Sequence, residues 1–278
     1  MEMTETIKNE HKLKDIEKVP FLFKNKDSFF ELIKNKRVVL FLDFVGTLSK
    51  IVNQPEDAII TDDMKEALRS CSEKFKTAVV SGRDMDDVKN KVSLDSVIYA
   101  GSHGFRISGP KGLKMRHPES AEILPNLNDI EKELNEILAG KIKGVRIERK
   151  MFAIAVHYRN ASEEDIPFID KKVTQLTKNN PDLKKGKGKK IFEIKPDLNW
   201  HKGKAIDWIL DSINMNKKDV VPVYLGDDVT DEDGFRTLFG KGIGILVSTH
   251  GKPTAAQYRL KDVDQVKDFL EMMSNLPK

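Results

Sequence analysis

The chain has 278 residues, with 48 lysines and arginines against 44 aspartates and glutamates, a net charge of +4, and one cysteine. This length can bury a sizeable core and indicates one large domain or two modest ones, which excludes a mini-protein. So small a charge excess does not resemble the basic stripe of a nucleic-acid-binding protein, and we expect no nucleic-acid partner.

We expect a cytosolic protein with no membrane partner. The longest apolar runs, such as residues 38–42, fall far short of the roughly 18 to 20 residues that span a bilayer. The start of the chain is acidic and polar, whereas a secretory signal has a basic start and an apolar centre. Cys71 has no second cysteine and no metal-ligand spacing around it, so we interpret it as a small buried apolar group rather than a catalytic thiol.

Residues 1–36 are rich in lysine but contain an apolar and aromatic cluster. Two interpretations stay open: a helix that docks through these side chains, or a solvated extension with one docking turn. The cluster consists of Phe21, Leu22, Phe23, Phe29, Phe30, Leu32 and Ile33.

Strands and helices then alternate at the spacing of βαβ units, which predicts a doubly wound, Rossmann-like parallel sheet. The first strand is a run of Val, Leu and Phe that ends at a glycine, as is typical of a strand buried on both faces. The expected elements are a strand at 37–43, a helix from Thr61 to about Ser72, a strand at 77–81, a helix at 84–91 and a strand at 97–100.

Residues 118–195 show a different pattern, which we interpret as an inserted α/β cap domain. We expect helices at 121–138 and 163–178, and strands at 145–148, 152–158 and 191–194. The lysine run at 184–190 is interpreted as a solvated hairpin tip, with attraction of an anionic substrate as the alternative. The βα alternation then returns, with a helix at 203–213, strands at 220–225 and 242–247, and a helix at 263–273. The predicted organisation is an extension (1–36), a core (37–117 and 196–278) and a cap (118–195).

Asp43 lies at the carboxyl end of the first buried strand, the edge of an open α/β sheet where ligands bind. Gly46 would let the backbone approach an anion, and Thr47 offers a hydroxyl. Such an aspartate can be a nucleophile or a metal ligand. The same five residues also fit an ordinary exit from a strand into a turn.

A second acidic group follows the strand at 220–225. Five carboxylates occupy the seven positions from Asp227 to Asp233 and repel one another unless a cation neutralises them. Hard oxygen ligands suit Mg²⁺. A solvated acidic turn is the alternative, but the preceding strand would deliver Asp227 to the same sheet edge as Asp43.

Two further groups complete this edge. The Ser81-Gly82-Arg83 turn provides a hydroxyl, a flexible link and a guanidinium suited to phosphate oxygens. Lys202 opens the next helix and can hold a phosphoryl group as a point charge. Taken together, the four groups predict a site for a metal and a phosphoryl group.

These four groups, in this order on βα units, resemble the signatures of the haloacid dehalogenase superfamily of phosphotransferases. More narrowly, further stretches resemble the trehalose-6-phosphate phosphatases, and the resemblance covers about residues 37–270. These stretches are Gly101-Ser-His-Gly104, Glu148-Arg-Lys150, His157-Tyr-Arg159, Glu193-Ile-Lys-Pro196 and Trp200-His-Lys-Gly203.

The resemblance implies Mg²⁺-dependent hydrolysis of trehalose 6-phosphate, or of a related sugar phosphate, through an aspartyl phosphate on Asp43. The metal would be held by Asp43, the backbone carbonyl of Val45 and Asp227. Asp228 and Asp231 would lie outside these ligands and orient the waters bound to the metal. The phosphoryl oxygens would be bound by Thr47, Ser81, Gly82, Arg83 and Lys202. The resemblance further implies that the cap closes over the sugar, whose hydroxyls would be bound by Glu148, Lys150, Glu193 and His103. For His103 and His157, a role in backbone or hinge geometry is the alternative.

The chain departs from the family at Val45, where the family has an aspartate that protonates the leaving oxygen and then activates water. General acid–base help of this kind is worth roughly 10² to 10⁴ in rate. We therefore expect an impaired enzyme, in which Val45 is either a substitution introduced to trap a bound species or a natural loss.

Two rival functions stay open: a phosphatase for another sugar phosphate, such as sucrose 6-phosphate, and a catalytically silent sugar-phosphate-binding protein. A dehydrogenase is disfavoured because no Gly-x-Gly-x-x-Gly follows the first strand. We expect a monomer.

Overall fold

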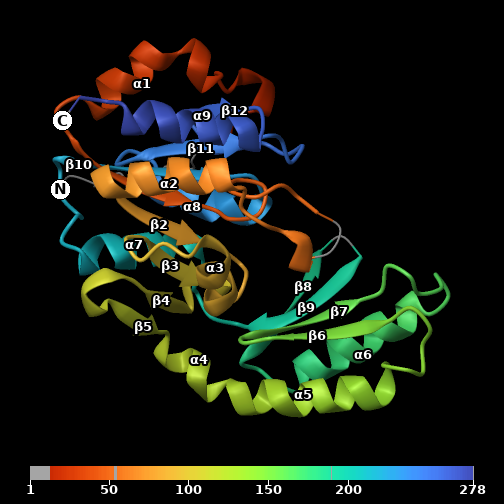
Figure 1. The fold of residues 1–278 in the computed structure, drawn as a ribbon. Helices are drawn as coiled ribbons and strands as arrows, with labels where there is room; N and C mark the ends of the chain where they lie inside the picture. Colours follow the sequence, from red (N-terminus) through yellow and green to blue (C-terminus); the bar gives the residue numbers. More distant parts are fainter. Residues whose placement is uncertain (1–12, 53–54, 189, 278) are drawn as a thin grey trace, which may run out of the picture.

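The computed structural model describes residues 13–52, 55–188 and 190–277, which form two sheets with helices packed on them (Figure 1). The larger sheet has eight strands in the order β12-β11-β10-β1-β2-β3-β4-β5, and the smaller has four in the order β6-β7-β9-β8. The predicted α/β class with a mostly parallel central sheet is confirmed.

The central sheet is parallel from β12 to β3 and antiparallel at β4 and β5. β1 lies in its middle, between β10 and β2. The strands are β1 (Arg37–Leu42), β2 (Lys76–Val80), β3 (Ile98–Gly101), β4 (Arg106–Ser108), β5 (Lys114–Arg116), β10 (Val220–Gly226), β11 (Ile243–Val247) and β12 (Tyr258–Leu260).

Helices cover both faces of this sheet, because β1 sends apolar side chains alternately to each. Leu40 and Leu42 belong to the hydrophobic cluster on one face, and Val39 and Phe41 to that on the other. On the first face lie α1 (Lys26–Ile33), α2 (Asp62–Lys74), α3 (Met85–Val92) and α9 (Val263–Ser274). On the second face lie α7 (Lys202–Ser212) and α8 (Glu232–Leu238). Burial on both faces is what makes the strand a continuous apolar run.

The N-terminal segment docks as a helix from residue 26 onward. Phe29 of α1 is fully buried, and its ring meets those of Tyr258 and Phe269 edge-on. The docked-helix interpretation is therefore confirmed for Lys26–Ile33, whereas the part of that prediction that covers residues 1–12 lies outside the described residues. Cys71 is buried on the same face, and burial raises the pKa of its thiol to about 12, which agrees with a packing role.

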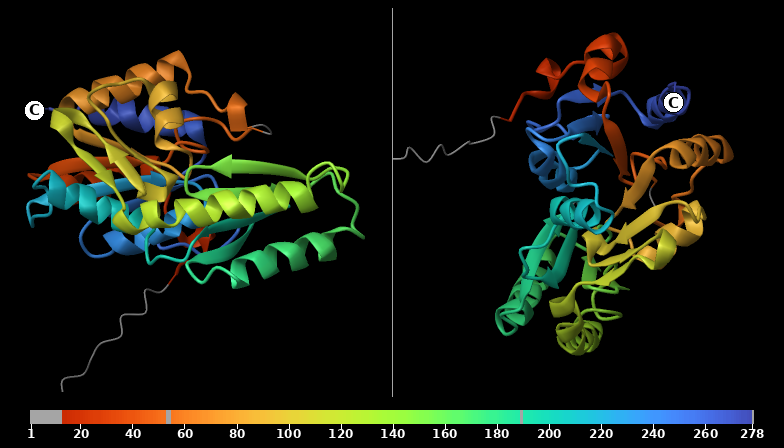
Figure 2. Two further views of the ribbon diagram at one scale, coloured as in Figure 1. Left: turned by 90° about the horizontal axis from the view of Figure 1, so that it is seen from below. Right: turned by 90° about the vertical axis from the view of Figure 1, so that its left-hand side faces the viewer.

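The four-stranded sheet is antiparallel throughout, and α5 and α6 cover the face turned away from the central sheet (Figures 1 and 2). Ile154 and Ile194 of its middle strands pack with Leu134 and Val173 of these helices. Its elements are α4 (Pro118–Glu122), α5 (Leu124–Ile137), β6 (Arg146–Lys150), β7 (Ala153–His157), α6 (Ile166–Lys178), β8 (Leu183–Gly188) and β9 (Ile191–Pro196).

The lysine run at 184–190 belongs to a hairpin whose Lys184, Lys187 and Lys190 are exposed, as predicted, but most of the run is strand rather than tip. Residues 184–188 belong to β8 and pair with β9, while Lys189 lies outside the described residues. Lys185 is mostly buried, because its ammonium lies 4.4 Å from the Phe192 ring centroid and forms an ion pair with Asp170. A lysine stem can cover apolar surface in this way, so lysines alone do not exclude a strand.

Three smaller differences have local causes. The helix expected at 121–138 is divided at Ile123, because Pro125 starts α5 as a first-turn residue. Pro167 likewise lies in the first turn of α6, so this helix begins at Ile166 rather than at 163. β4, β5 and β12 were not predicted because each has three residues, too few for a periodic pattern. In the described part of the chain, no helix has the length and apolar character needed to cross a membrane.

Candidate active site

The parallel pairing of β1, β2 and β10 brings three predicted site segments to one edge of the central sheet. Asp43, Ser81 and Asp227 each directly follow one of these strands. The backbone N–H of Asp43 donates to Leu225 O at 2.8 Å, and that of Ser81 donates to Ala100 O at 2.8 Å. The ladder hydrogen bonds therefore continue one residue past the strands and fix where these side chains start.

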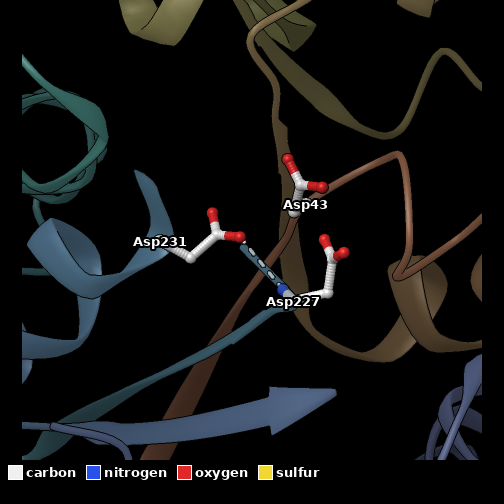
Figure 3. A group of neighbouring side chains, drawn as sticks. All are labelled: Asp43, Asp227 and Asp231. Carbon is white, nitrogen blue, oxygen red and sulfur yellow. Dashed lines mark hydrogen bonds between the residues drawn. The ribbon is translucent and has the colours of Figure 1, made fainter. Parts of the chain in front are cut away.

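Asp43, Asp227 and Asp231 form a carboxylate cluster (Figure 3). Each offers an oxygen, and these oxygens all lie within 4.8 Å of one another. Burial raises the pKa of Asp43 to about 7, with Asp231 adding to the rise and Lys202 opposing it. Burial also raises the pKa of Asp227 to about 8, and the charges of Asp43 and Asp231 add to it. The cluster thus favours either protons or a cation.

Lys202, at the start of α7, provides one cation. Its Nζ donates to Asp43 Oδ1 at 2.6 Å and to Asp231 Oδ1 at 2.5 Å, and its side chain is only 3% exposed. Burial alone would lower the pKa of Lys202, but Asp231 and Asp43 outweigh this and raise it. Three ionised carboxylates and one ammonium leave a net charge of −2. A divalent cation with a preference for oxygen ligands would balance this charge, so the donor set fits Mg²⁺.

Asp231 has all its hydrogen-bonding capacity used by the protein. Its Oδ1 accepts from Lys202 and from the hydroxyl of Tyr224. Its Oδ2 accepts from the backbone N–H group of Asp227 (Figure 3) and from that of Asp228, both at 3.0 Å. Asp228 is exposed and is not one of the three clustered carboxylates, and its Oδ1 accepts from Val229 N at 2.7 Å. Asp231 therefore holds the turn that carries Asp227.

Tyr224 was missed by sequence reasoning. It lies within the apolar strand β10 and is fully buried, so it reads as a core residue. A buried phenol nevertheless needs a hydrogen-bond partner, and an acidic turn follows directly. That requirement is the one signal that could have identified it.

The turn after β1 approaches the cluster closely at Gly46. Its φ is +84°, and a Cβ there would lie 2.1 Å from Asp227 Oδ2, so only glycine fits. Val45, beside it, is partly buried and packs against the hydrophobic cluster of the α2 face. The hydroxyl oxygen of Thr47 is fully buried, yet it has no hydrogen-bond partner among the described residues. Because buried hydroxyls are normally paired, Thr47 offers an unused donor to a ligand.

The Ser81-Gly82-Arg83 turn lies beside this edge and is packed against His103. Ser81 is buried, and its Oγ accepts from Arg83 N at 3.2 Å. The Arg83 guanidinium forms an ion pair with Asp87 on α3. A Cβ on Gly82 would lie 2.8 Å from His103 Cε1, so glycine makes room for this ring.

His103 has the backbone role named as its alternative. Its φ is +57°, and its N–H donates to Ser81 O at 2.8 Å, so it ties two turns together. Burial lowers the pKa of His103 to about 4, and the charge of Lys202 contributes. The imidazole is therefore neutral at neutral pH. It still lines the cavity described below and can present a ring nitrogen there.

The four-stranded sheet presents a polar face toward this edge, carrying Glu148, Lys150 and Glu193. Glu148, Ala155 and Glu193 are in register across β6, β7 and β9, so they share one face, and Lys150 follows two positions after Glu148. Lys150 Nζ lies 3.5 Å from Glu193 Oε1. Glu148 Oε2 lies 2.6 Å from the Nε2 of His157. His157 therefore holds the Glu148 side chain.

Charges on this face act on groups at the carboxylate edge. Burial would raise the pKa of Glu193, but Lys150, Lys195 and His103 together lower it. His103 in turn responds to Lys202, so charge interactions connect the polar face to the cluster. A cavity of about 510 Å³ lies in this region and is lined by His103, Lys184, Lys195, Trp200 and Lys202 among others. This volume suits a small polar molecule. Arg159 is exposed.

Comparisons with known proteins agree with this geometry. The family model for trehalose-phosphatase matches residues 41–264. Trehalose 6-phosphate phosphatase RA3 of Zea mays is 38% identical over 275 residues, which cover 94% of this chain and 76% of the relative. The solved C-terminal domain of C. albicans trehalose-6-phosphate phosphatase is 25% identical, covering 93% of this chain and 99% of that one, with a TM-score of 0.72.

A more distant structure identifies the fold. A haloacid dehalogenase-like hydrolase from Bacteroides thetaiotaomicron is 15% identical and superposes with a TM-score of 0.63, over 86% of this chain and 100% of that one. The chain therefore belongs to the trehalose-phosphatase family and has the fold of haloacid dehalogenase-like hydrolases.

Proposed function

We propose that the chain hydrolyses trehalose 6-phosphate to trehalose and phosphate, with Mg²⁺ and through an aspartyl phosphate on Asp43. The observation that carries this proposal is the carboxylate cluster, which is balanced by Lys202 and lies at the turn of Thr47, whose buried hydroxyl has no hydrogen-bond partner among the described residues. It is supported by family membership and by a relative whose name states this substrate.

Asp43 is the group that attacks phosphorus, and Lys202 prepares it. The ammonium donates to Asp43 Oδ1 at 2.6 Å, which restrains the carboxylate and leaves Oδ2 as the oxygen that attacks. Attack forms the bond from carboxylate oxygen to phosphorus and breaks the bond from phosphorus to the sugar oxygen. Lys202 and the Thr47 hydroxyl then lie beside the phosphoryl oxygens as donors, with Ser81 and Arg83 close by.

Mg²⁺ would be held by Asp43, Asp227 and the backbone carbonyl of Val45. When bound, it neutralises the phosphate charge that otherwise repels a carboxylate nucleophile. The chain's own contribution is to keep these oxygens together: Asp231 fixes the Asp227 turn, and Gly46 lets that carboxylate approach the β1 turn.

The sugar would lie against the polar face of the four-stranded sheet. We propose that residues 118–195 form a cap over a core of residues 37–117 and 196–278, and that Glu148, Lys150 and Glu193 bind sugar hydroxyls. Charged side chains form strong hydrogen bonds with hydroxyls when water is excluded. Ala155 lies between the two glutamates in register, which leaves room for a sugar ring on this face.

Position 45 limits the rate. Valine can neither protonate the leaving sugar oxygen nor activate the water that hydrolyses the aspartyl phosphate. The missing acid–base help corresponds to roughly 3 to 5 kcal/mol of activation free energy. The metal site tolerates the valine, because position 45 contributes only its carbonyl oxygen.

A substrate panel tests the proposal. With Mg²⁺, phosphate release should be faster from trehalose 6-phosphate than from sucrose 6-phosphate or glucose 6-phosphate, and Glu148→Ala and Glu193→Ala should remove this preference. The exposed Glu163→Ala on the same sheet unit is the matched control. A preference for another sugar phosphate that survives both substitutions would contradict the assignment of substrate.

Val45 also favours a second candidate, a sugar-phosphate-binding protein that does not turn over. Calorimetry distinguishes the two functions. Trehalose 6-phosphate that binds and is recovered unchanged after long incubation supports the binding protein, whereas stoichiometric release of phosphate supports the enzyme.

A further inference from the structure

The turn between β6 and β7, Met151-Phe152, contacts the core at a residue outside the site described above. This turn connects Lys150, the last residue of β6, to Ala153, the first of β7. Its Met151 N–H donates to both carboxylate oxygens of Asp84, each at 3.3 Å. Asp84 lies on the core, directly after the Ser81-Gly82-Arg83 turn.

Asp84 does not cap α3 with its side chain, although its position predicts this role. It is the N-cap residue of α3, where an aspartate normally accepts from the first N–H groups of the helix. Its side chain makes no such bond. It accepts instead from Ser102 Oγ at 2.9 Å, beside His103, and from Met151 N across the gap between the sheets.

Ring contacts reinforce this attachment. The Phe152 ring lies 5.6 Å from that of Phe105 on the core, and the Arg116 guanidinium lies 5.8 Å from the Phe152 centroid. Phe105 also contacts His117 and Trp200, which lie where the chain passes between the two sheets. The turn is thus a third connection between the sheets, in addition to the two crossings of the chain.

The same turn is held from its own side by Arg149. The Nη1 of Arg149 donates to Met151 O at 3.1 Å, and its guanidinium pairs with Glu131 of α5 at 3.2 Å. The turn carbonyls are therefore fixed to the smaller sheet and the turn N–H to the core. The backbone of Lys150, the residue before the turn, is thereby held close to the core.

We propose that Asp84 is a positioning residue that fastens the β6–β7 turn to the core and thereby holds Lys150 and His103 at the sugar-phosphate site. The positioning part rests on the proposed function, whereas the attachment itself does not.

Two measurements on the full chain test this. Hydrogen exchange at the Met151 amide should be about tenfold faster or more in Asp84→Ala, because its acceptor is a charged group. Affinity for trehalose 6-phosphate, measured by calorimetry with Mg²⁺, should fall about tenfold, while affinity for inorganic phosphate, which needs only the core, should stay within about twofold. The exposed Asp95→Ala, after the end of α3, removes the same charge and should change neither.

Each outcome decides one part. Unchanged exchange at Met151 in Asp84→Ala overturns the attachment. Faster exchange with unchanged affinity for trehalose 6-phosphate overturns the positioning role, as does an equal loss of affinity for inorganic phosphate. If the parent chain binds no trehalose 6-phosphate, the proposed function fails while the exchange result still decides the attachment. Should Asp84→Ala not fold, Asp84→Asn keeps one acceptor oxygen without the charge and should exchange faster at Met151 than the parent does. Exchange equal to that of the parent then overturns the proposal.

Discussion

Replacing Lys202 by methionine tests whether the carboxylate cluster is held together by charge. Lys202 is 3% exposed and is the ammonium that pairs with both Asp43 and Asp231, at 2.6 and 2.5 Å. Removing one partner of a buried pair leaves carboxylates uncompensated, at a cost of about 3 to 5 kcal/mol in the free energy of unfolding. For a chain of this size, that corresponds to a melting temperature lower by about 10 °C.

The assay is thermal unfolding of metal-free protein at about pH 9, above the pKa values of Asp43 and Asp227, followed by circular dichroism. Lys204→Met is the matched control, because Lys204 lies two residues further along α7 and is exposed. It should lower the free energy of unfolding by less than about 0.5 kcal/mol. Mg²⁺ should stabilise Lys202→Met by binding the folded state only. Equal stability of the two variants without metal would refute the reasoning that Lys202 neutralises the cluster.

Two further predictions concern the same edge. The pKa values of Asp43 and Asp227 are higher in the folded state than in the unfolded state, so the folded metal-free protein binds extra protons. Its melting temperature should therefore fall as the pH rises from about 5 to about 8. Mg²⁺ should oppose this fall, and a melting temperature that rises over this range would contradict the pKa shifts. Thr47→Val should weaken inorganic phosphate binding about tenfold in calorimetry without lowering stability, since the hydroxyl has no hydrogen-bond partner in the part of the chain that the structure describes. Thr77→Val removes a hydroxyl that donates to Phe75 O. It should lower the stability of the protein and leave phosphate binding unchanged.

The sheet edge could be predicted because it depends on local pattern. The buried strands before Asp43 and Asp227 are apolar runs, and parallel strands place their carboxyl ends at one edge. The convergence of these two residues with Ser81 follows from that rule alone. The same rule could not place Lys202. This residue lies at the start of a helix, and the sequence predicted only that the helix covers one face of the sheet.

Features that depend on contacts between distant segments could not be predicted. Tyr224 reads as a core residue until its hydroxyl is seen to donate to Asp231. Asp84 reads as a helix cap, and its acceptor role toward Met151 depends on how the two sheets meet. The strand β8 was not predicted because its sequence is rich in lysine. Burial of Lys185 depends on its contacts with Phe192 and Asp170, which the sequence does not show.

The most direct test of the account is phosphate release from trehalose 6-phosphate, with Mg²⁺, by the parent chain, Val45→Asp and Asp43→Asn. The account predicts slow release by the parent chain, release faster by roughly 10² to 10⁴ in Val45→Asp, and none in Asp43→Asn. Val45→Asp no faster than the parent chain would contradict the claim that position 45 limits the reaction, and activity retained in Asp43→Asn would contradict Asp43 as the nucleophile.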